Sequence, residues 1–289
     1  MSFVVFTDGC SNLPGYILDR KQIRTLPFSY TINGEQIVYN GDIETFDAHG
    51  HYELLRNGEL IQTSLANSQQ FIDYFRPVLE AGQDVVYIGM SSGISGTYQA
   101  STIAAEELME QFPQRRIRTV DSLGAGFGPG LLAILAADLR SEGKTADETA
   151  DFLDQKRMDL CEFFTVDDLM FLRRTGRLST TGALVGTMLG IKPILRGDEE
   201  GHIVVSLKCR GRKKAVDTLA QLYQTRVVDA ANQVVAISHG DCLEDAQALA
   251  DKICAIAQPK ELLFCPHEPV TGSHVGPGML AVFFFGEGR

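Results

Sequence analysis

The first half of the chain alternates short apolar runs with longer amphipathic segments, and this alternation limits the possible folds more than any other feature. Segments that read as strands lie at residues 3–8, 84–90 and 116–122, and the first two are apolar runs typical of buried strands. Helical patterns lie between and after them, at residues 68–82, 97–112 and 130–143. Because strands that alternate with helices usually form a parallel sheet covered on both faces, this half predicts a doubly wound α/β domain. Asn33 and Gly34 also predict the turn of a hairpin over residues 26–40.

The pattern changes after a helical segment at residues 145–160. Residues 191–209 read as two strands joined by an acidic, glycine-containing turn, and further strands and helices follow. We therefore predict an α/β protein of two domains. The first, residues 1–158, contains the doubly wound parallel sheet, and the second, residues 159–289, is a mixed α/β domain.

Composition excludes several classes of protein. The net charge is −11 and the pI is near 5.0, so no general positive field exists to neutralise the phosphates of a nucleic acid. The six cysteines include no CxxC pair, which argues against a disulfide framework or a zinc site and favours reduced thiols in a cytoplasmic protein. The N-terminus has no basic segment typical of a signal peptide, and no apolar run is long enough to span a bilayer.

Segments rich in Ser, Thr and Gly follow most of the predicted strands, where ligands of parallel α/β sheets usually bind. They are "TDGCSN" at 7–12, "TSLANS" at 63–68, "SSGISGT" at 91–97, "DSLGAGFGPG" at 121–130, "SHGD" at 238–241 and "GSHVGPG" at 272–278. Hydroxyl groups and exposed N–H groups near helix starts suit an anionic head group, a carboxylate or a phosphate. Ordinary helix capping explains each segment taken alone. Asp8 and Asp121, at two strand ends, are suited to orient these loops by accepting N–H bonds.

Three familiar motifs fail on spacing. The segment "GAGFGPG" lacks the third glycine of GxGxxG, and "EGKTADE" lacks the first glycine of a P-loop because Asp138 stands there. The segment around Ser95 is one residue short of the GxSxG elbow of serine hydrolases. We expect no metal site and no cofactor.

Two basic segments stand out in this acidic chain. The first contains Arg173, Arg174 and Arg177, and the second runs from Lys208 to Lys214. Such runs are often only solvated surface, but together they also suit a patch for an acidic or phosphate-bearing partner.

Taken in order, several of these segments resemble the DegV family, the fatty-acid-binding proteins of bacterial fatty acid kinase systems. The resemblance covers nearly the whole chain and rests on "FTDGCSNLP", "TS" at 63–64, "SSGISGTYQ", "DSLGAGFGPG", "LMFLRRTGRLS", "LGIKPIL", "KCRGRKKA" and "GSHVGPG".

The resemblance implies an internal tunnel that holds one long-chain fatty acid with its carboxylate facing outward. In this sequence Thr63, Ser92 or Ser95, and His274 are the matching carboxylate-binding residues, with the choice between the two serines open. It further implies that a separate kinase subunit phosphorylates the carboxylate to an acyl phosphate, and Arg173, Arg174 and Arg210 match the residues that dock this subunit. The protein itself is then not an enzyme. We also expect transient contact with a membrane surface.

The chain departs from the family's pattern at Gly9 and Cys10, where Ser and Thr are common, at Ala66, where Pro is common, and at Gly126, where a hydroxyl is common. With fewer hydroxyl donors, backbone N–H groups are expected to contribute more of the head-group contact. Two other interpretations stay open: an acyl hydrolase that uses Ser95 and His274, and a sensor of a small anion.

Overall fold

The computed structural model describes residues 3–178 and 190–289. Ser179 and Leu189, which belong to two of the segments that carry the resemblance, lie outside these ranges. Contacts within the chain group it into two compact units. Unit 1 comprises the chain up to Phe46 together with Gln62–Arg157, and unit 2 comprises Asp47–Ile61 together with Met158–Arg289. The division of the sequence into domains at residue 158 stays a prediction.

The centre of unit 1 is a four-stranded parallel sheet. Its strands are β1 (Phe3–Asp8), β2 (Ile23–Leu26), β6 (Asp84–Gly89) and β7 (Ile117–Asp121), in the order β2-β1-β6-β7. Every residue of β1 and β6 is buried, as expected for strands covered on both faces. The chain turns from β1 to β2 on one side and later returns to β6 on the other, so the strand order reverses between β1 and β6.

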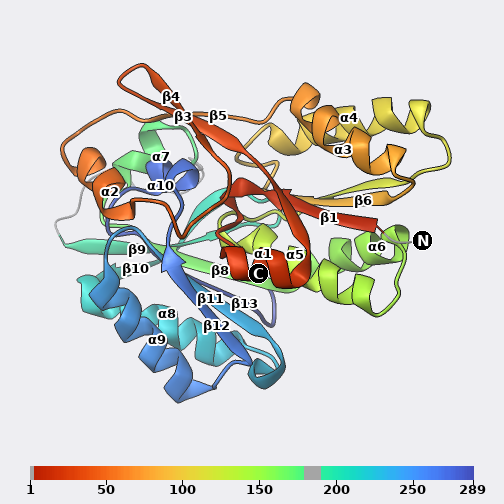
Figure 1. The fold of residues 1–289 in the computed structure, drawn as a ribbon. Coiled ribbons are helices and arrows are strands. Elements are labelled where there is room, and N and C mark those ends of the chain that lie inside the picture. The colour runs from red at the N-terminus through yellow and green to blue at the C-terminus, as the bar shows by residue number, and fades with distance from the viewer. Residues whose placement is uncertain (1–2, 179–189) are drawn as a thin grey trace. The chain divides into compact units, whose positions relative to one another are not determined.

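Helices cover both faces of this sheet (Figure 1). The helices α3 (Ser68–Glu80) and α4 (Thr97–Gln111) pack on β6 and β7, and α5 (Phe127–Ser141) and α6 (Ala146–Lys156) pack on β1, β6 and β7 from the other side. The short α1 (Gly15–Lys21) packs on β2 and α5. Both α3 and α6 begin with capping boxes, in which the N-cap side chain and the third helical residue satisfy each other's backbone N–H groups.

A second, antiparallel sheet of unit 1 has the order β4-β3-β5. It contains β3 (Phe28–Ile32), β4 (Glu35–Tyr39) and β5 (Gln62–Ser64), and Asn33 and Gly34 form the expected turn between the first two strands with positive φ angles. A short 3₁₀ helix (Gly9–Ser11) follows β1 directly.

Unit 2 is built on a six-stranded mixed sheet. Its strands are β8 (Leu160–Thr165), β9 (Ile191–Gly197), β10 (Ile203–Arg210), β11 (Val234–His239), β12 (Glu261–Pro266) and β13 (Leu280–Phe285). The order is β10-β9-β8-β13-β11-β12, and only β11 and β12 pair in parallel. The prediction of a mixed second α/β fold is confirmed.

The helices α8 (Arg212–Arg226) and α9 (Leu243–Ile256) lie side by side against one face of this sheet (Figure 1). Alternate residues of the strands, such as Phe163, Val282 and Phe284, join these helices in one apolar core. Three shorter helices complete the unit: α2 (Ala48–Arg56), α7 (Met170–Arg174) and α10 (Pro269–Val275), with α10 packed against both others. Short 3₁₀ helices lie at Arg157–Asp159 and Ala230–Asn232.

Seven helices and strands of the described residues were not expected from the sequence: β2, β5, β8, α1, α2, α7 and α10. The most consequential is α10, because it places His274 on a helix where a loop was expected. Among the described residues, the helices are all too short or too polar to cross a bilayer.

Candidate functional site

The segment Ser91–Gly96, here called the serine loop, follows β6 at the point where the strand order of the parallel sheet reverses. Ligands of doubly wound sheets usually bind beyond the carboxyl ends of the strands at this point. The loop leads directly into α4, which begins at Thr97. The prediction that a buried strand is followed here by a loop and then a helix is therefore confirmed.

The two candidate serines of this loop differ in what their hydroxyl groups do. The Ser95 hydroxyl donates to Thr97 Oγ1 over 3.0 Å and accepts the Thr97 backbone N–H over 3.3 Å, so it is engaged with the first residue of α4. Ser92 is exposed, and within residues 3–178 and 190–289 its hydroxyl makes no hydrogen bond. Ser92 therefore has the more available donor.

The backbone N–H groups along the serine loop are largely used inside unit 1. The N–H of Met90, just before the loop, donates to Asp8 Oδ2 over 2.7 Å. The N–H of Ser91 donates to the Gly124 carbonyl over 2.8 Å, and the N–H of Ser92 donates to Asp121 Oδ1 over 3.2 Å. Ser91 itself accepts the others, at its Oγ from Gly93 over 3.0 Å and at its carbonyl from Ile94 and Ser95, both over 3.2 Å. Few backbone N–H groups of residues 91–95 are therefore left for a ligand, and an anion at this loop would rely mainly on side-chain donors. For the loops at Gly9 and Gly126, the expectation that backbone N–H groups replace the missing hydroxyls stays a prediction.

Thr63 lies on the covered face of the small antiparallel sheet. It pairs with Tyr30, which also pairs with Ile37, and Tyr30 is only 7% exposed. Because side chains alternate along a strand, the next residue, Ser64, lies on the opposite and exposed face. A methyl group built on Gly96 would lie 3.5 Å from Leu65 Cδ2, so the segment after Thr63 lies against the end of the serine loop.

His274 lies in the last turn of α10 and is half-buried. Burial, together with the smaller effect of the nearby positive charge of Arg177, lowers the pKa of its imidazole to about 4. The side chain is therefore neutral near pH 7 and takes part in hydrogen bonding without adding a full charge.

A buried hydrogen-bond network holds α10 in place. Glu268 caps the helix by accepting the N–H groups of Val270 (2.6 Å) and Thr271 (2.7 Å). The His267 imidazole lies between Ser238 Oγ (2.9 Å) and Thr271 Oγ1 (2.7 Å), and burial lowers its pKa to about 3. Sequence reasoning missed this network, although Glu268 followed by Pro269 is a typical helix start.

The three arginines proposed for docking have different surroundings in unit 2. Arg173 and Arg174 are exposed on α7, and the Arg174 guanidinium lies 4.5 Å from the centre of the Phe171 ring. Phe171 in turn packs over Gly276, just after the helix that carries His274. Arg210 is exposed at the end of β10.

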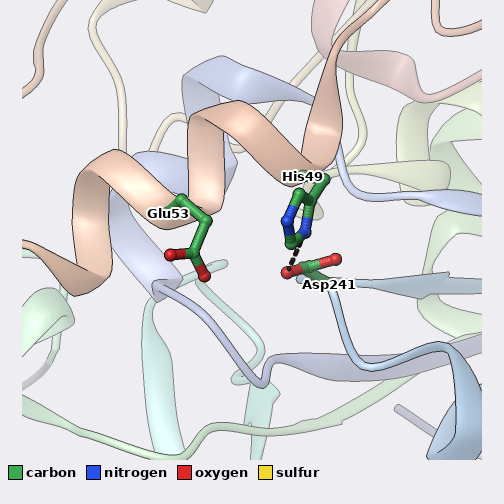
Figure 2. Close-up of side chains that lie close together, drawn as sticks. All are labelled: His49, Glu53 and Asp241. Atoms are coloured by element: carbon green, nitrogen blue, oxygen red, sulfur yellow. Dashed lines mark hydrogen bonds and ion pairs between the residues drawn. The ribbon is translucent and has the colours of Figure 1, made fainter.

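Figure 2 shows three side chains that sequence spacing did not bring together: His49 and Glu53, one turn apart on α2, and Asp241 after β11. His49 Nδ1 lies 3.1 Å from Asp241 Oδ2. However, the guanidinium of Arg56 lies 2.7 Å from a Glu53 oxygen and 2.5 Å from Asp241 Oδ2. Since both carboxylates already share a cation, we interpret the cluster as an attachment of α2 to the end of β11.

Comparison with known proteins identifies the family. A family model described as "Uncharacterised protein, DegV family" matches residues 2–287. The chain belongs to the DegV family. A DegV domain-containing protein of Clostridium perfringens is 38% identical over 285 residues, which cover 99% of this chain and 98% of the relative. A DegV domain-containing protein of Lactococcus lactis is 33% identical, with 98% and 97% of the two chains covered.

Solved DegV structures share the whole fold. A structure reporting fatty acid binding by a DegV family protein from Thermus thermophilus has a TM-score of 0.89 and 26% identity, over 99% of this chain and all of that chain. The structure of DegV, a fatty acid binding protein from Bacillus subtilis, has a TM-score of 0.84 and 27% identity with the same coverage. The predicted family and fold class are thus confirmed.

Proposed function

We propose that this DegV protein binds one long-chain fatty acid in an internal tunnel and presents its carboxylate to a separate kinase subunit for acyl phosphate formation. Thr63, Ser92 and His274 bind the carboxylate, and the protein performs no chemistry itself. Ser95 supports the site through its hydrogen bonds to Thr97, the first residue of α4.

The observation that carries this proposal is the exposed Ser92 hydroxyl, which has no partner among the described residues, on a loop fixed at the switch point of the parallel sheet. The structural relatives from Thermus thermophilus and Bacillus subtilis, which cover the whole chain, are fatty-acid-binding proteins by their names. Thr63, on the covered face of its sheet, and the neutral His274 supply further uncharged groups. Uncharged donors hold a carboxylate while leaving it reactive toward an incoming phosphoryl group.

Binding energy comes mainly from the acyl chain. A C16 chain that buries about 14 methylene groups gains roughly 11 kcal/mol, at about 0.8 kcal/mol for each. Association and ordering remove much of this gain. The head-group residues then decide which end of the ligand faces outward, which is the property that a kinase requires.

Arg173, Arg174 and Arg210 are proposed to dock the kinase subunit. All three side chains are exposed, and the protein as a whole has a net charge of −11. A local positive charge at these arginines would attract an acidic surface of the kinase subunit, which the remaining, mostly negative surface of the protein would repel. We also propose that the protein works in the cytoplasm and takes up its ligand during transient contact with a membrane surface, where free fatty acids partition.

The hydrolase interpretation loses its main support, because the Ser95 hydroxyl donates to Thr97 rather than to a histidine. The geometry does not distinguish a fatty acid carrier from a sensor of a small anion, so the ligand-binding experiment below decides between them.

The direct test is mass spectrometry of the gently purified protein. We expect one fatty acid per protein, and after its removal a long-chain fatty acid should rebind while acetate and phosphate should not. A lipid-free protein that binds acetate or phosphate but no fatty acid would contradict the proposal. Ester hydrolysis that disappears in Ser95→Ala would favour the hydrolase instead.

The head-group assignment is tested with a matched pair of serine variants. Ser92→Ala should weaken fatty acid binding about tenfold or more, since a hydrogen bond to a charged group contributes about 1.5–3 kcal/mol. Ser95→Ala should mainly destabilise the start of α4. The reverse order of effects would assign the carboxylate to Ser95.

The docking assignment is tested by charge reversal. Arg174→Glu should reduce acyl phosphate formation by a fatty acid kinase with ATP, with the fatty acid content of the protein unchanged. Arg20→Glu, at an exposed position on α1 of unit 1, serves as the control. Equal rates for the wild type and Arg174→Glu would remove this residue from the docking surface.

A further inference from the structure

Two carboxyl groups hold the serine loop from its two sides. β6 lies between β1 and β7 in the parallel sheet, and the last residue of each flanking strand is an aspartate, Asp8 on β1 and Asp121 on β7. Asp8 Oδ2 accepts the N–H of Met90 over 2.7 Å, and Asp121 Oδ1 accepts the N–H of Ser92 over 3.2 Å. Each neighbour of the central strand therefore fixes one end of the three-residue segment 90–92.

Asp8 is itself held in one orientation. Its Oδ1 accepts a hydrogen bond from the Tyr87 hydroxyl over 2.5 Å, and both side chains are fully buried. Gly89 makes room for this contact, because a methyl group on Gly89 would lie only 2.7 Å from the Tyr87 hydroxyl oxygen. Tyr87, Gly89 and Asp8 thus form a built support beneath the loop.

Asp121 also organises the loop that follows β7. The same Oδ1 that accepts the Ser92 N–H accepts the N–H of Leu123 over 3.0 Å, and Leu123 has a positive φ of 56°. Beyond this turn, the Gly124 carbonyl accepts the N–H of Ser91. The serine loop and the β7 loop are therefore joined by one carboxyl group and one backbone bond.

We propose that Asp8 and Asp121 are the positioning residues of the head-group site: their buried carboxyl groups fix the backbone of residues 90–92 so that the Ser92 hydroxyl is directed at the ligand. This inference rests on the proposed function, because it names the residues through which Ser92 acts. Neither aspartate touches the ligand; both act through the loop.

The test is a double-mutant cycle between Ser92→Ala and Asp121→Ala, with the affinity for hexadecanoic acid measured on the delipidated full-length protein. Each single variant should bind about tenfold more weakly. Because Asp121 acts only through Ser92, the double variant should bind hexadecanoic acid no more weakly than the single variant of lower affinity. If Asp121 had only a structural role, the fold-loss in affinity of the double variant would be the product of the two single fold-losses.

A matched control is available at the other end of the same strand. Asp84, the first residue of β6, is also buried and accepts a backbone N–H, that of Arg116, over 3.0 Å. Asp84→Ala should therefore lower stability in a similar way and leave the affinity unchanged. Should Asp121→Ala not fold, Asp121→Asn keeps an acceptor oxygen of lower charge, and an affinity loss of about threefold is expected from it.

The outcomes separate this inference from the function on which it rests. If the wild type binds no fatty acid, the proposed function fails. If the wild type binds and Ser92→Ala or Asp121→Ala binds equally well, or if their losses multiply, the positioning role is overturned while fatty acid binding stands. Non-multiplying losses together with an unaffected Asp84→Ala support the role.

Discussion

The buried carboxyl group of Asp8 should make the stability of the protein depend on pH in a direction opposite to that of most aspartates. Burial raises the pKa of Asp8 from its ordinary value of 3.8 to about 6, against the hydrogen bonds from Tyr87 and the Met90 N–H, which lower it. A raised pKa means that the folded protein prefers the protonated carboxyl group more than the unfolded chain does. The contribution of Asp8 to stability is therefore fully present below about pH 3.8 and is lost as the pH rises through about 6.

The magnitude follows from the two pKa values. One pKa unit corresponds to about 1.4 kcal/mol, so the difference between 3.8 and about 6 amounts to about 3 kcal/mol. Asp8→Asn has no group to titrate at this position. The free energy of unfolding of Asp8→Asn relative to the wild type should therefore rise by about 3 kcal/mol from acid to neutral pH, with about half of the change between about pH 5 and about pH 7.5.

The measurement is urea unfolding of both proteins across this pH range. Only the difference between the variant and the wild type is used, because all other titrating groups then cancel, as does any pH-independent loss of hydrogen bonding. Tyr87→Phe is an informative second variant. It removes a hydrogen bond that lowers the pKa of Asp8, so the midpoint of the dependence should move to higher pH. A difference between Asp8→Asn and the wild type that stays flat with pH would refute the reasoning.

Three further substitutions test the supports of the site by chemical denaturation. Gly89→Ala should cost about 1–3 kcal/mol, because the added methyl group overlaps the Tyr87 hydroxyl; a neutral effect would show that Tyr87 is free to move. Glu268→Ala should cost about 2–4 kcal/mol, since two buried N–H groups of α10 lose their acceptor, and a loss below about 1 kcal/mol would contradict this role. Gly278→Ala should cost at least about 2 kcal/mol, because Gly278 has a φ of 75° and its added methyl group would meet Asp167; an unchanged midpoint would argue against both reasons.

The sequence predicts best those elements whose local pattern also reflects their final burial. Strands β1 and β6 are mostly apolar and fully buried, and the helices α3 and α6 begin with recognisable caps. β8 was missed because "LCEFFT" follows a helix with no Gly or Pro to separate them, so it reads as the end of that helix. α2 was missed because its first turns are polar, and its buried Tyr52 is placed by a hydrogen bond to the carbonyl of His267, far away in the sequence.

Some residues of the candidate site were likewise recognisable from the sequence, and others were not. Asp8 and Asp121 were recognisable from the sequence, since acidic residues at strand ends are suited to accept loop N–H groups. Tyr87 was not, because a tyrosine within a buried apolar strand looks like ordinary core, and only the fold shows that its hydroxyl reaches Asp8. Likewise, nothing in the spacing indicates that Arg177 lies close enough to lower the pKa of His274.

The N–H groups of the serine loop donate to acceptors within the protein, and this also affects which anion the site prefers. The sequence left a carboxylate and a phosphate equally suited to the Ser, Thr and Gly segments. Phosphate sites at strand-to-helix turns usually depend on several backbone N–H groups that converge on the ligand. Here Asp8, Asp121, Gly124 and the loop's own oxygens accept those groups, and the two aspartates place acidic side chains behind the loop. A phosphate, with up to two negative charges and more acceptor oxygens to satisfy, loses most from this arrangement, whereas a carboxylate needs only one or two hydroxyl donors. On the proposed function, the same bias weakens the hold on the acyl phosphate product relative to the fatty acid, which favours release of the head group once the phosphoryl group has been transferred.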